Sequence, residues 1–252
     1  MLTKDAAVCI RAVDYSETSQ IATFFTRATG KISAIAKGAK RPKSAFDGPI
    51  EVFSHGRIVF SDSSREKLAT LTEFEQQPSF PKLRNNLFAL NCCLFGAELV
   101  NSLTKDYDPH PGLFDSFMQF LQNTGNAKNK SEMLALLILF QLSLLKEVGL
   151  MPVFNACVNC KTRYEARGTK DETNWLEVYF SSAANGFICR DCEANFQDKI
   201  SLTRNAAVYL ADLKLLAGAQ EKTLQEVERI LIYHFTETLG HPPKMAKHIL
   251  GL

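Results

Sequence analysis

The first third of the chain alternates short apolar runs with polar turns, and the runs carry residue types that suit strands. Ile, Val, Thr and Phe are frequent in them, and Gly, Ser and Asp separate them. The candidate strands cover residues 8–13, 20–26, 31–37, 50–61 and 68–76. Five short strands in such a short span predict a small β-barrel.

Beyond residue 86 the apolar positions recur with the period of an α-helix, as in Leu87, Leu90 and Leu94. The candidate helices cover residues 86–103, 113–122, 131–148, 202–217 and 223–239. The last of these opens with Thr223-Leu-Gln-Glu226, a sequence with the form of a capping box. Thr223 is therefore expected to cap that helix.

Polar, turn-rich sequence at about residues 153–198 interrupts the helical part, with a strand-like run at 175–181. We expect the helices on either side of this module to pack together. The pattern predicts an α+β, multidomain fold. A barrel domain occupies residues 1–80, and a helical domain that carries the inserted module occupies residues 81–252.

Four cysteines in two Cys-x-x-Cys pairs are the strongest chemical signal in the sequence. They are Cys157, Cys160, Cys189 and Cys192. Two such pairs can supply the four thiolates of a tetrahedral site, and zinc is its usual occupant. The alternatives are two disulfides, a redox pair, or a site that no longer holds metal. With sulfur at every position, one zinc ion here would be structural, because no position stays open for water or substrate.

Composition is that of an ordinary globular protein, with 46% hydrophobic residues, 22% charged residues and a net charge of +2. The most apolar stretch, residues 133–145, is shorter than the roughly 20 residues that span a bilayer, so it predicts a buried helix. The polar start, Met1-Leu-Thr-Lys-Asp5, lacks the apolar run of a signal peptide. We expect a cytoplasmic protein that does not contact a membrane.

The densest basic run lies between residues 27 and 46, and no acidic residue interrupts it. Its cations are Arg27, Lys31, Lys37, Lys40, Arg41 and Lys43. Gly38 and Pro42 favour an exposed loop, and mobile cations on such a loop suit a phosphate backbone. These six residues are the candidate DNA-binding residues, and single-stranded nucleic acid is a plausible ligand. The alternative is a solvated loop that aids solubility.

Aromatic side chains near this run could add base stacking. They are Phe24, Phe25, Phe46, Phe53 and Phe60. The alternative reading is that they form the core of the barrel, where large aromatic residues are usually buried.

Signals of catalysis are weak throughout the chain. The five histidines form no metal-binding array, and the sequence holds no nucleophile elbow, P-loop or dinucleotide fingerprint. A nuclease would need clustered carboxylates, for which Asp106, Asp108 and Asp115 are the nearest candidates. We therefore expect a protein that is not an enzyme. A zinc-containing scaffold for protein–protein contacts, with incidental DNA affinity, is the alternative to a DNA-binding protein.

Several segments together resemble the bacterial recombination mediator RecO family. They are Tyr15-Ser-Glu-Thr-Ser-Gln-Ile21, Ala36-Lys-Gly-Ala-Lys-Arg-Pro-Lys-Ser44, Leu145-Lys-Glu-Val-Gly-Leu-Met-Pro152 and Asn185-Gly-Phe-Ile-Cys189. The four cysteines belong to the same resemblance, which covers nearly the whole chain.

The resemblance implies an OB-fold barrel followed by an α-helical body with an inserted four-cysteine, zinc-ribbon-like module. It also implies a role in recombinational DNA repair, in the bacterial cytoplasm and associated with the nucleoid. Such proteins bind single- and double-stranded DNA and anneal complementary strands. They cooperate with RecR and single-strand-binding protein to load RecA recombinase.

Overall fold

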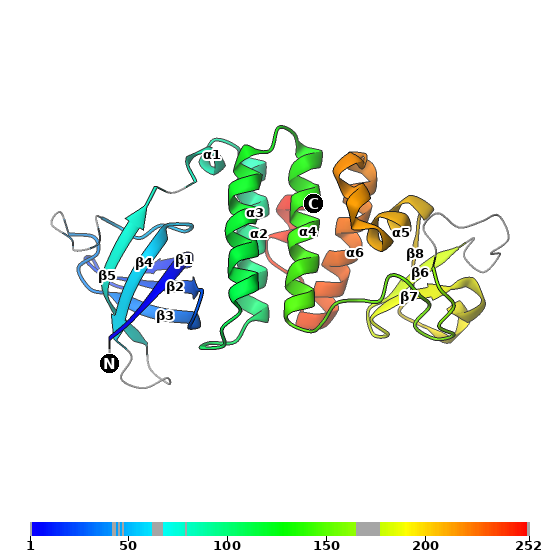
Figure 1. Cartoon of the computed structure of the whole chain (residues 1–252), viewed down its shortest axis with the longest axis horizontal. Coiled ribbons are helices and arrows are strands. Elements are labelled where there is room, and N and C mark those ends of the chain that lie inside the picture. The colour runs from blue at the N-terminus through cyan, green and yellow to red at the C-terminus, as the bar shows by residue number, and fades with distance from the viewer. Residues whose placement is uncertain are drawn as a thin grey trace. The chain divides into compact units, whose positions relative to one another are not determined.

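The computed structural model describes residues 2–41, 44, 46, 48–61, 68–78, 80–164 and 177–250. The chain divides into two compact units, Met1–Asn126 and Ala127–Leu252, here called the barrel unit and the cysteine unit. The barrel unit contains a β-barrel and three helices. The cysteine unit contains helices and a small sheet (Figure 1).

Five strands of the barrel unit close into an OB-like barrel. They are β1 (Leu2–Asp14), β2 (Gln20–Thr26), β3 (Gly30–Ala36), β4 (His55–Ser61) and β5 (Ala69–Gln77). In the closed order β1-β2-β3-β5-β4, every neighbouring pair is antiparallel except β3 and β5, which are parallel. The long strand β1 pairs with both β2 and β4 and so closes the barrel. The predicted small barrel and the α+β class are confirmed.

Strand alternation fills the interior of the barrel with apolar side chains. Phe24 and Ile32 are fully buried there, and Phe24 meets Phe74 edge-on with ring centroids 5.4 Å apart. Gly30 starts β3 with φ 84°, and a Cβ atom at this position would lie 2.3 Å from the carbonyl oxygen of Asp108. The position therefore requires glycine.

Three helices complete the barrel unit. They are α1 (Pro81–Arg84), α2 (Leu87–Leu103) and α3 (Pro111–Asn126). α2 begins after Asn86, whose side chain accepts hydrogen bonds from two backbone N–H groups of the first turn. α3 packs on the outside of β2, where Phe25 contacts Phe114 and Phe117 at centroid distances of 5.9 and 6.4 Å. One face of the barrel is thereby covered.

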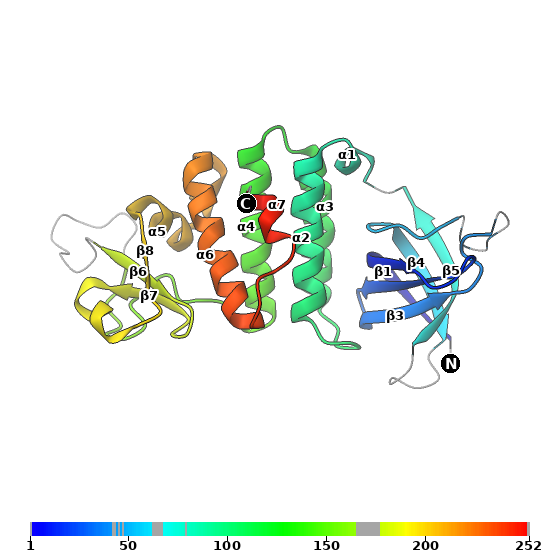
Figure 2. The ribbon, with the colours of Figure 1, turned by 180° about the vertical axis from the view of Figure 1, so that it is seen from behind.

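The cysteine unit contains a three-stranded sheet that follows its first helix in the chain and lies beside α5, the helix Arg204–Ala211 (Figure 2). Its elements are α4 (Lys130–Glu147), β6 (Val178–Ser181), β7 (Gly186–Cys189), η2 (Arg190–Asn195), β8 (Ile200–Leu202), α5 (Arg204–Ala211), η3 (Leu213–Gly218), α6 (Glu221–Leu239) and α7 (Ala246–Leu250). The sheet has the order β7-β6-β8 with antiparallel pairs.

The helices α4 and α6 lie side by side (Figure 1), as expected for the helices that flank the module. α4 is apolar on most of its surface and is followed by Gly149, with φ 76°. The backbone N–H of Leu150 donates to the carbonyl of Leu145 at 2.7 Å and completes the helix end. Among the described residues, no helix combines the length and apolar character needed to cross a bilayer.

The predicted capping box was wrong. Thr223 lies inside α6, which already begins at Glu221. Glu226 instead accepts hydrogen bonds of 2.7 Å from the backbone N–H and the hydroxyl of Thr203, the N-cap of α5. Glu226 therefore links α6 to the start of α5 and does not cap α6.

Two predicted elements are shorter than expected. The run at 202–217 breaks at Asp212, whose carboxylate accepts from the backbone N–H of Lys214 at 3.2 Å and starts η3. The strand expected at 50–61 begins only at His55, because Phe53, with φ 70°, turns the chain and its backbone N–H donates to Cys9 O. Local polar bonds interrupt the apolar pattern in both cases.

Candidate metal centre and nucleic-acid interface

The four predicted cysteine ligands lie together in the cysteine unit. All four sulfur atoms are within 4.8 Å of one another, and those of Cys160 and Cys189 are 3.6 Å apart. Sulfur atoms bound at about 2.3 Å around a tetrahedral zinc ion lie about 3.8 Å apart. A disulfide would need an S–S distance near 2.05 Å. The arrangement fits a four-sulfur metal site.

The first pair is held in a tight turn. The backbone N–H of Cys157 donates to Thr162 O at 2.9 Å, and that of Lys161 donates back to Cys157 O at 3.0 Å. Lys161 adopts φ 64°, which closes the turn and leaves Cys160 exposed at its tip. Both sulfurs are thus presented from one short loop.

The second pair comes from the end of β7 and from η2, which starts directly after Cys189. The first loop lies along β7: the backbone N–H of Phe187 donates to Val153 O, and that of Val158 donates to Phe187 O, each at 2.9 Å. A Cβ atom on Gly186 would lie 2.5 Å from Val153 O, so only glycine permits this approach. The hydrogen bonds of β7 therefore bring the two pairs together.

The environments of the sulfur atoms differ. Hydrogen bonding to Thr162 lowers the pKa of Cys160 to about 6, whereas burial raises the pKa of Cys189 above its ordinary value. The side-chain amide of Asn159 donates to the sulfur of Cys192 at 3.2 Å. A bound cation would favour the thiolate form of all four ligands, and these hydrogen bonds would orient them.

Two of the predicted DNA-binding cations, Arg27 and Lys31, bind groups on or next to the helices of the barrel unit. Arg27 donates two hydrogen bonds of 2.9 Å to Asp115 on α3 and lowers the pKa of that carboxyl group. The ammonium group of Lys31 donates to Asn101 O at 2.7 Å and to Thr104 O at 2.9 Å, and its side chain is only 12% exposed. Both residues connect the barrel to its helices, so their free charge is reduced.

The loop at residues 37–41, here called the basic loop, leads away from β3. Lys40 pairs with Asp14 at 2.7 Å. Lys37 and Arg41 are exposed, and neither has an ion pair within the part of the chain that the structure describes. Lys43 lies outside the described residues. The assignment of the six cations to DNA binding remains a prediction.

The phenylalanines considered for base stacking are all buried. Phe24, Phe25, Phe46, Phe53 and Phe60 are each at most 5% exposed. The core reading therefore holds for each of them. The aromatic residue that reaches solvent beside the basic loop is Tyr15, 64% exposed, and its polar neighbours in Asp14-Tyr-Ser-Glu17 could have indicated this from the sequence.

The aspartates considered for a nuclease site each face a neighbouring basic side chain. Asp115 binds Arg27, Asp106 lies 3.4 Å from Lys31, and Asp108 lies 3.5 Å from His110. Among the described residues, the four cysteines are the one group of three or more potential ligands gathered around a common point. The carboxylates thus do not form a metal cluster in the described part of the chain.

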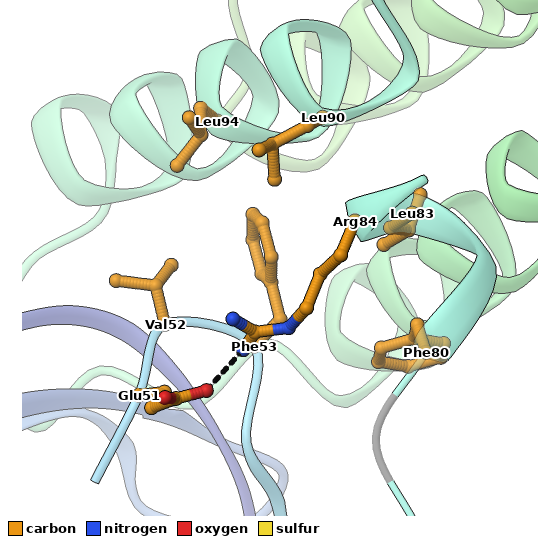
Figure 3. A pocket seen from close by; sticks show the side chains of 8 residues that line it. All are labelled: Glu51, Val52, Phe53, Phe80, Leu83, Arg84, Leu90 and Leu94. Carbon is orange, nitrogen blue, oxygen red and sulfur yellow. Dashed lines mark hydrogen bonds and ion pairs between the residues drawn. The ribbon is translucent and has the colours of Figure 1, made fainter. Parts of the chain in front are cut away.

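An apolar pocket of about 330 Å³ lies in the barrel unit, between the segment before β4 and the helices α1 and α2 (Figure 3). Its lining is Glu51, Val52, Phe53, Phe80, Leu83, Arg84, Leu90 and Leu94. The two charged side chains of this lining, Glu51 and Arg84, pair with each other. The pocket offers apolar contact area rather than acid–base or nucleophilic chemistry.

Comparison with known proteins gives one consistent result over both units. The family description "Recombination protein O N terminal" matches residues 1–80, and "Recombination protein O C terminal" matches residues 84–247. A protein named DNA repair protein RecO from Bacillus subtilis is 30% identical over 247 residues, which cover 95% of this chain and 91% of the relative. A protein of the same name from Halalkalibacterium halodurans is 32% identical over 95% of this chain and 91% of the relative. Another from Rhodopirellula baltica is 30% identical over 82% of this chain and 73% of its own.

Proposed function

The chain belongs to the recombination protein O (RecO) family of DNA repair proteins, and from this premise we propose that it is a recombination mediator. In this role it binds single- and double-stranded DNA and anneals complementary strands. It also helps to load RecA recombinase on strands coated with single-strand-binding protein. The observation that carries the proposal is the exposed pair Lys37 and Arg41 on an OB-like barrel.

Annealing on such a surface needs electrostatic screening and no bond cleavage. Two complementary strands repel each other through their phosphates, and exposed cations reduce that repulsion while base pairing supplies the driving force. The protein acts without a catalytic residue in this scheme. If about four to six phosphates are neutralised, the logarithm of the affinity for single strands falls with the logarithm of salt concentration at a slope of about −3 to −4.

The metal proposed for the four cysteines is one structural zinc ion. Cys157, Cys160, Cys189 and Cys192 would bind it as thiolates and so fix the first loop against β7. The ion would supply folding free energy to the module and no catalysis, because its four positions are filled by protein sulfur.

The assignment of separate roles to the two domains is also a proposal. The barrel, residues 1–80, would bind DNA, and residues 81–252 would hold the module and the contacts with RecR and single-strand-binding protein. The site of action would be the bacterial cytoplasm, on the nucleoid. These assignments follow from family membership and from the exposed cations of the barrel.

A test is the rate of annealing of two complementary labelled oligonucleotides over a range of salt concentrations. Lys37→Glu/Arg41→Glu should slow annealing and weaken binding to all sequences alike. A matched control is Lys4→Glu/Lys105→Glu, which changes the charge equally at exposed positions. Lys4 lies ten residues before Asp14 on β1, about 30 Å from the end that carries the basic loop. Equal annealing by both variants would refute the proposal.

The apolar pocket favours a second candidate, a zinc-containing scaffold that binds protein partners and has only incidental DNA affinity. Its lining is mostly apolar, so a partner bound there would bind with little dependence on salt. Leu90→Asp should then abolish partner binding and leave strand annealing unchanged. Loss of annealing in Lys37→Glu/Arg41→Glu would favour the mediator.

A further inference from the structure

An apolar row crosses the outer face of three barrel strands. Val13 on β1 pairs with Ile21 on β2, which pairs in turn with Ile35 on β3. The adjacent pair, Ala12 and Ala22, packs against the barrel core, so alternation directs the row outward. Val13 is 40% exposed, and the two isoleucines are half-buried. The row is a shallow apolar strip on the surface of the barrel.

Tyr15 lies just beyond the end of this row, in the turn that joins β1 to β2. The backbone N–H groups of Tyr15 and Ser16 donate to Ser19 O at 2.9 and 3.1 Å. The hydroxyl of Ser16 accepts from the backbone N–H groups of Thr18 and Ser19. The backbone of the turn is therefore held in one conformation while the tyrosine ring stays 64% exposed.

The same turn holds the basic loop. The backbone N–H of Lys40 donates to Thr18 O at 3.1 Å, and that of Gly38 donates to the hydroxyl of Ser19 at 3.3 Å. The Lys40–Asp14 ion pair adds a third link. The turn that carries the exposed ring of Tyr15 and the loop that carries Lys37 and Arg41 are thus fixed to each other, next to the apolar strip, and form one surface region.

We propose that this surface binds unpaired nucleotides, with the ring of Tyr15 stacked on a base. The apolar row Val13, Ile21 and Ile35 contacts the neighbouring base and sugar, and Lys37 and Arg41 neutralise the adjacent phosphates. This inference rests on the proposed function and gives it a specific site for single-stranded DNA.

The chemistry of the Tyr15 ring, the apolar row and the two cations favours single-stranded nucleic acid as the ligand. Bases within a duplex stack on one another and expose only their edges, so an aromatic ring can stack on a base only where the base is unpaired. Stacking accepts any base, since every base has a π-face, and the cations contact the backbone without regard to sequence. A duplex would therefore use the cations but not Tyr15.

The test compares Tyr15→Ala and Tyr15→Phe with the wild-type chain by fluorescence anisotropy. Three probes of equal length are used: oligo(dT), a duplex, and an abasic strand with the same backbone. Loss of one stacked base costs about 1–3 kcal/mol, so Tyr15→Ala should bind oligo(dT) roughly 5- to 150-fold more weakly at an unchanged salt slope. Tyr15→Phe should bind oligo(dT) like the wild type. Duplex and abasic strand should bind the wild type and Tyr15→Ala equally.

Two outcomes separate this inference from the proposed function. Wild-type binding to oligo(dT) with no loss in Tyr15→Ala, or an equal loss on the abasic strand, refutes stacking and leaves the mediator role intact. A wild-type chain that binds none of the three probes refutes both. Thermal melts show whether each variant is folded.

A second measurement reports stacking directly. In a Trp175→Phe background, which removes the chain's single tryptophan, Tyr15→Trp should lose fluorescence on addition of oligo(dT) and keep it on addition of the abasic strand. Equal responses to the two strands would overturn the proposal.

Discussion

The side-chain amide of Gln141 on α4 donates a 2.7 Å hydrogen bond to the fully buried carboxyl group of Glu228 on α6. Burial raises the pKa of Glu228 to about 8, so the group carries a proton at neutral pH. The other two polar atoms of this pair, Glu228 Oε2 and Gln141 Oε1, have no hydrogen-bond partner among the described residues. A protonated carboxyl group can donate to the amide oxygen, which would satisfy both atoms in one acid–amide pair.

The first prediction concerns the pH dependence of the cysteine unit. Because the folded pKa of Glu228 lies above its ordinary value of 4.5, its contribution to stability is complete below that value and is lost as pH rises through about 8. Glu228→Gln preserves a paired amide without a titrating group, so it should be more stable than the wild type at pH 9, by up to a few kcal/mol. Thermal melts at pH 7 and pH 9 measure the difference.

Glu237→Gln is the control for this prediction, because Glu237 is exposed on the same helix. It should follow the wild-type curve at both pH values. If Glu228→Gln loses as much stability as the wild type between pH 7 and pH 9, the buried carboxyl group does not titrate in this range.

The second prediction concerns acid pH. The Nδ1 atom of His234 on α6 lies 2.8 Å from the hydroxyl of Ser182, and burial lowers the pKa of His234 below 6.5. A depressed histidine pKa means that stability is full above 6.5 and is lost as pH falls below it, since the unfolded chain binds the proton first. The wild type should therefore lose stability between pH 7 and pH 5.5 relative to His234→Gln.

Ser182→Ala provides an independent check on the same contact. It leaves the buried imidazole nitrogen without this partner and should cost about 1–3 kcal/mol at pH 7. His241→Gln, at an exposed position after α6, should change neither the stability nor its pH dependence. A wild-type acid profile identical to that of His234→Gln would show that another group is responsible.

The sequence predicted the elements whose signals are local. The β-formers at residues 20–26 match β2 at both ends. β1 was expected at residues 8–13 but starts at Leu2, because pairing with β4 extends it through residues of low β-propensity. The short strands β7 and β8 were not predicted, since three or four residues carry too little periodicity.

The parts of the candidate site differ in how far the sequence predicts them, because only some of them have a local signal. The spacing of the cysteines is itself the signal, and the structure brings all four together. The partners of the cations were not visible, because Arg27 and Asp115 are 88 positions apart in the sequence. An acid-free run in the sequence therefore did not mean an acid-free surface. The exposure of Tyr15, by contrast, had a local signal in its polar neighbours Asp14, Ser16 and Glu17.

The third prediction concerns metal removal. The purified chain should contain one zinc ion, and chelation should first increase hydrogen exchange in the segment 153–164 and in β7, which the proposed ion holds together. The barrel unit should exchange as before. Cys189→Ser should lower the zinc content measured by mass spectrometry, whereas Cys92→Ala should keep one ion per chain. Unchanged exchange at residues 153–164 in metal-free protein would make the ion dispensable for the fold.

The fourth prediction separates the two roles of the basic loop. Lys40→Glu places a carboxylate beside Asp14 and removes one link between the loop and the β1–β2 turn, so it should lower the thermal midpoint of the barrel unit. Lys37→Glu/Arg41→Glu alters two exposed side chains without ion pairs in the described structure and should leave that midpoint unchanged. If each cation neutralises one phosphate, the double variant should reduce the magnitude of the salt slope for single strands by about 1.4. Anisotropy titrations at several salt concentrations measure that slope. An unchanged slope with an unchanged midpoint would exclude these two residues from the DNA interface, because the surface would then be folded and its charge reversed without effect.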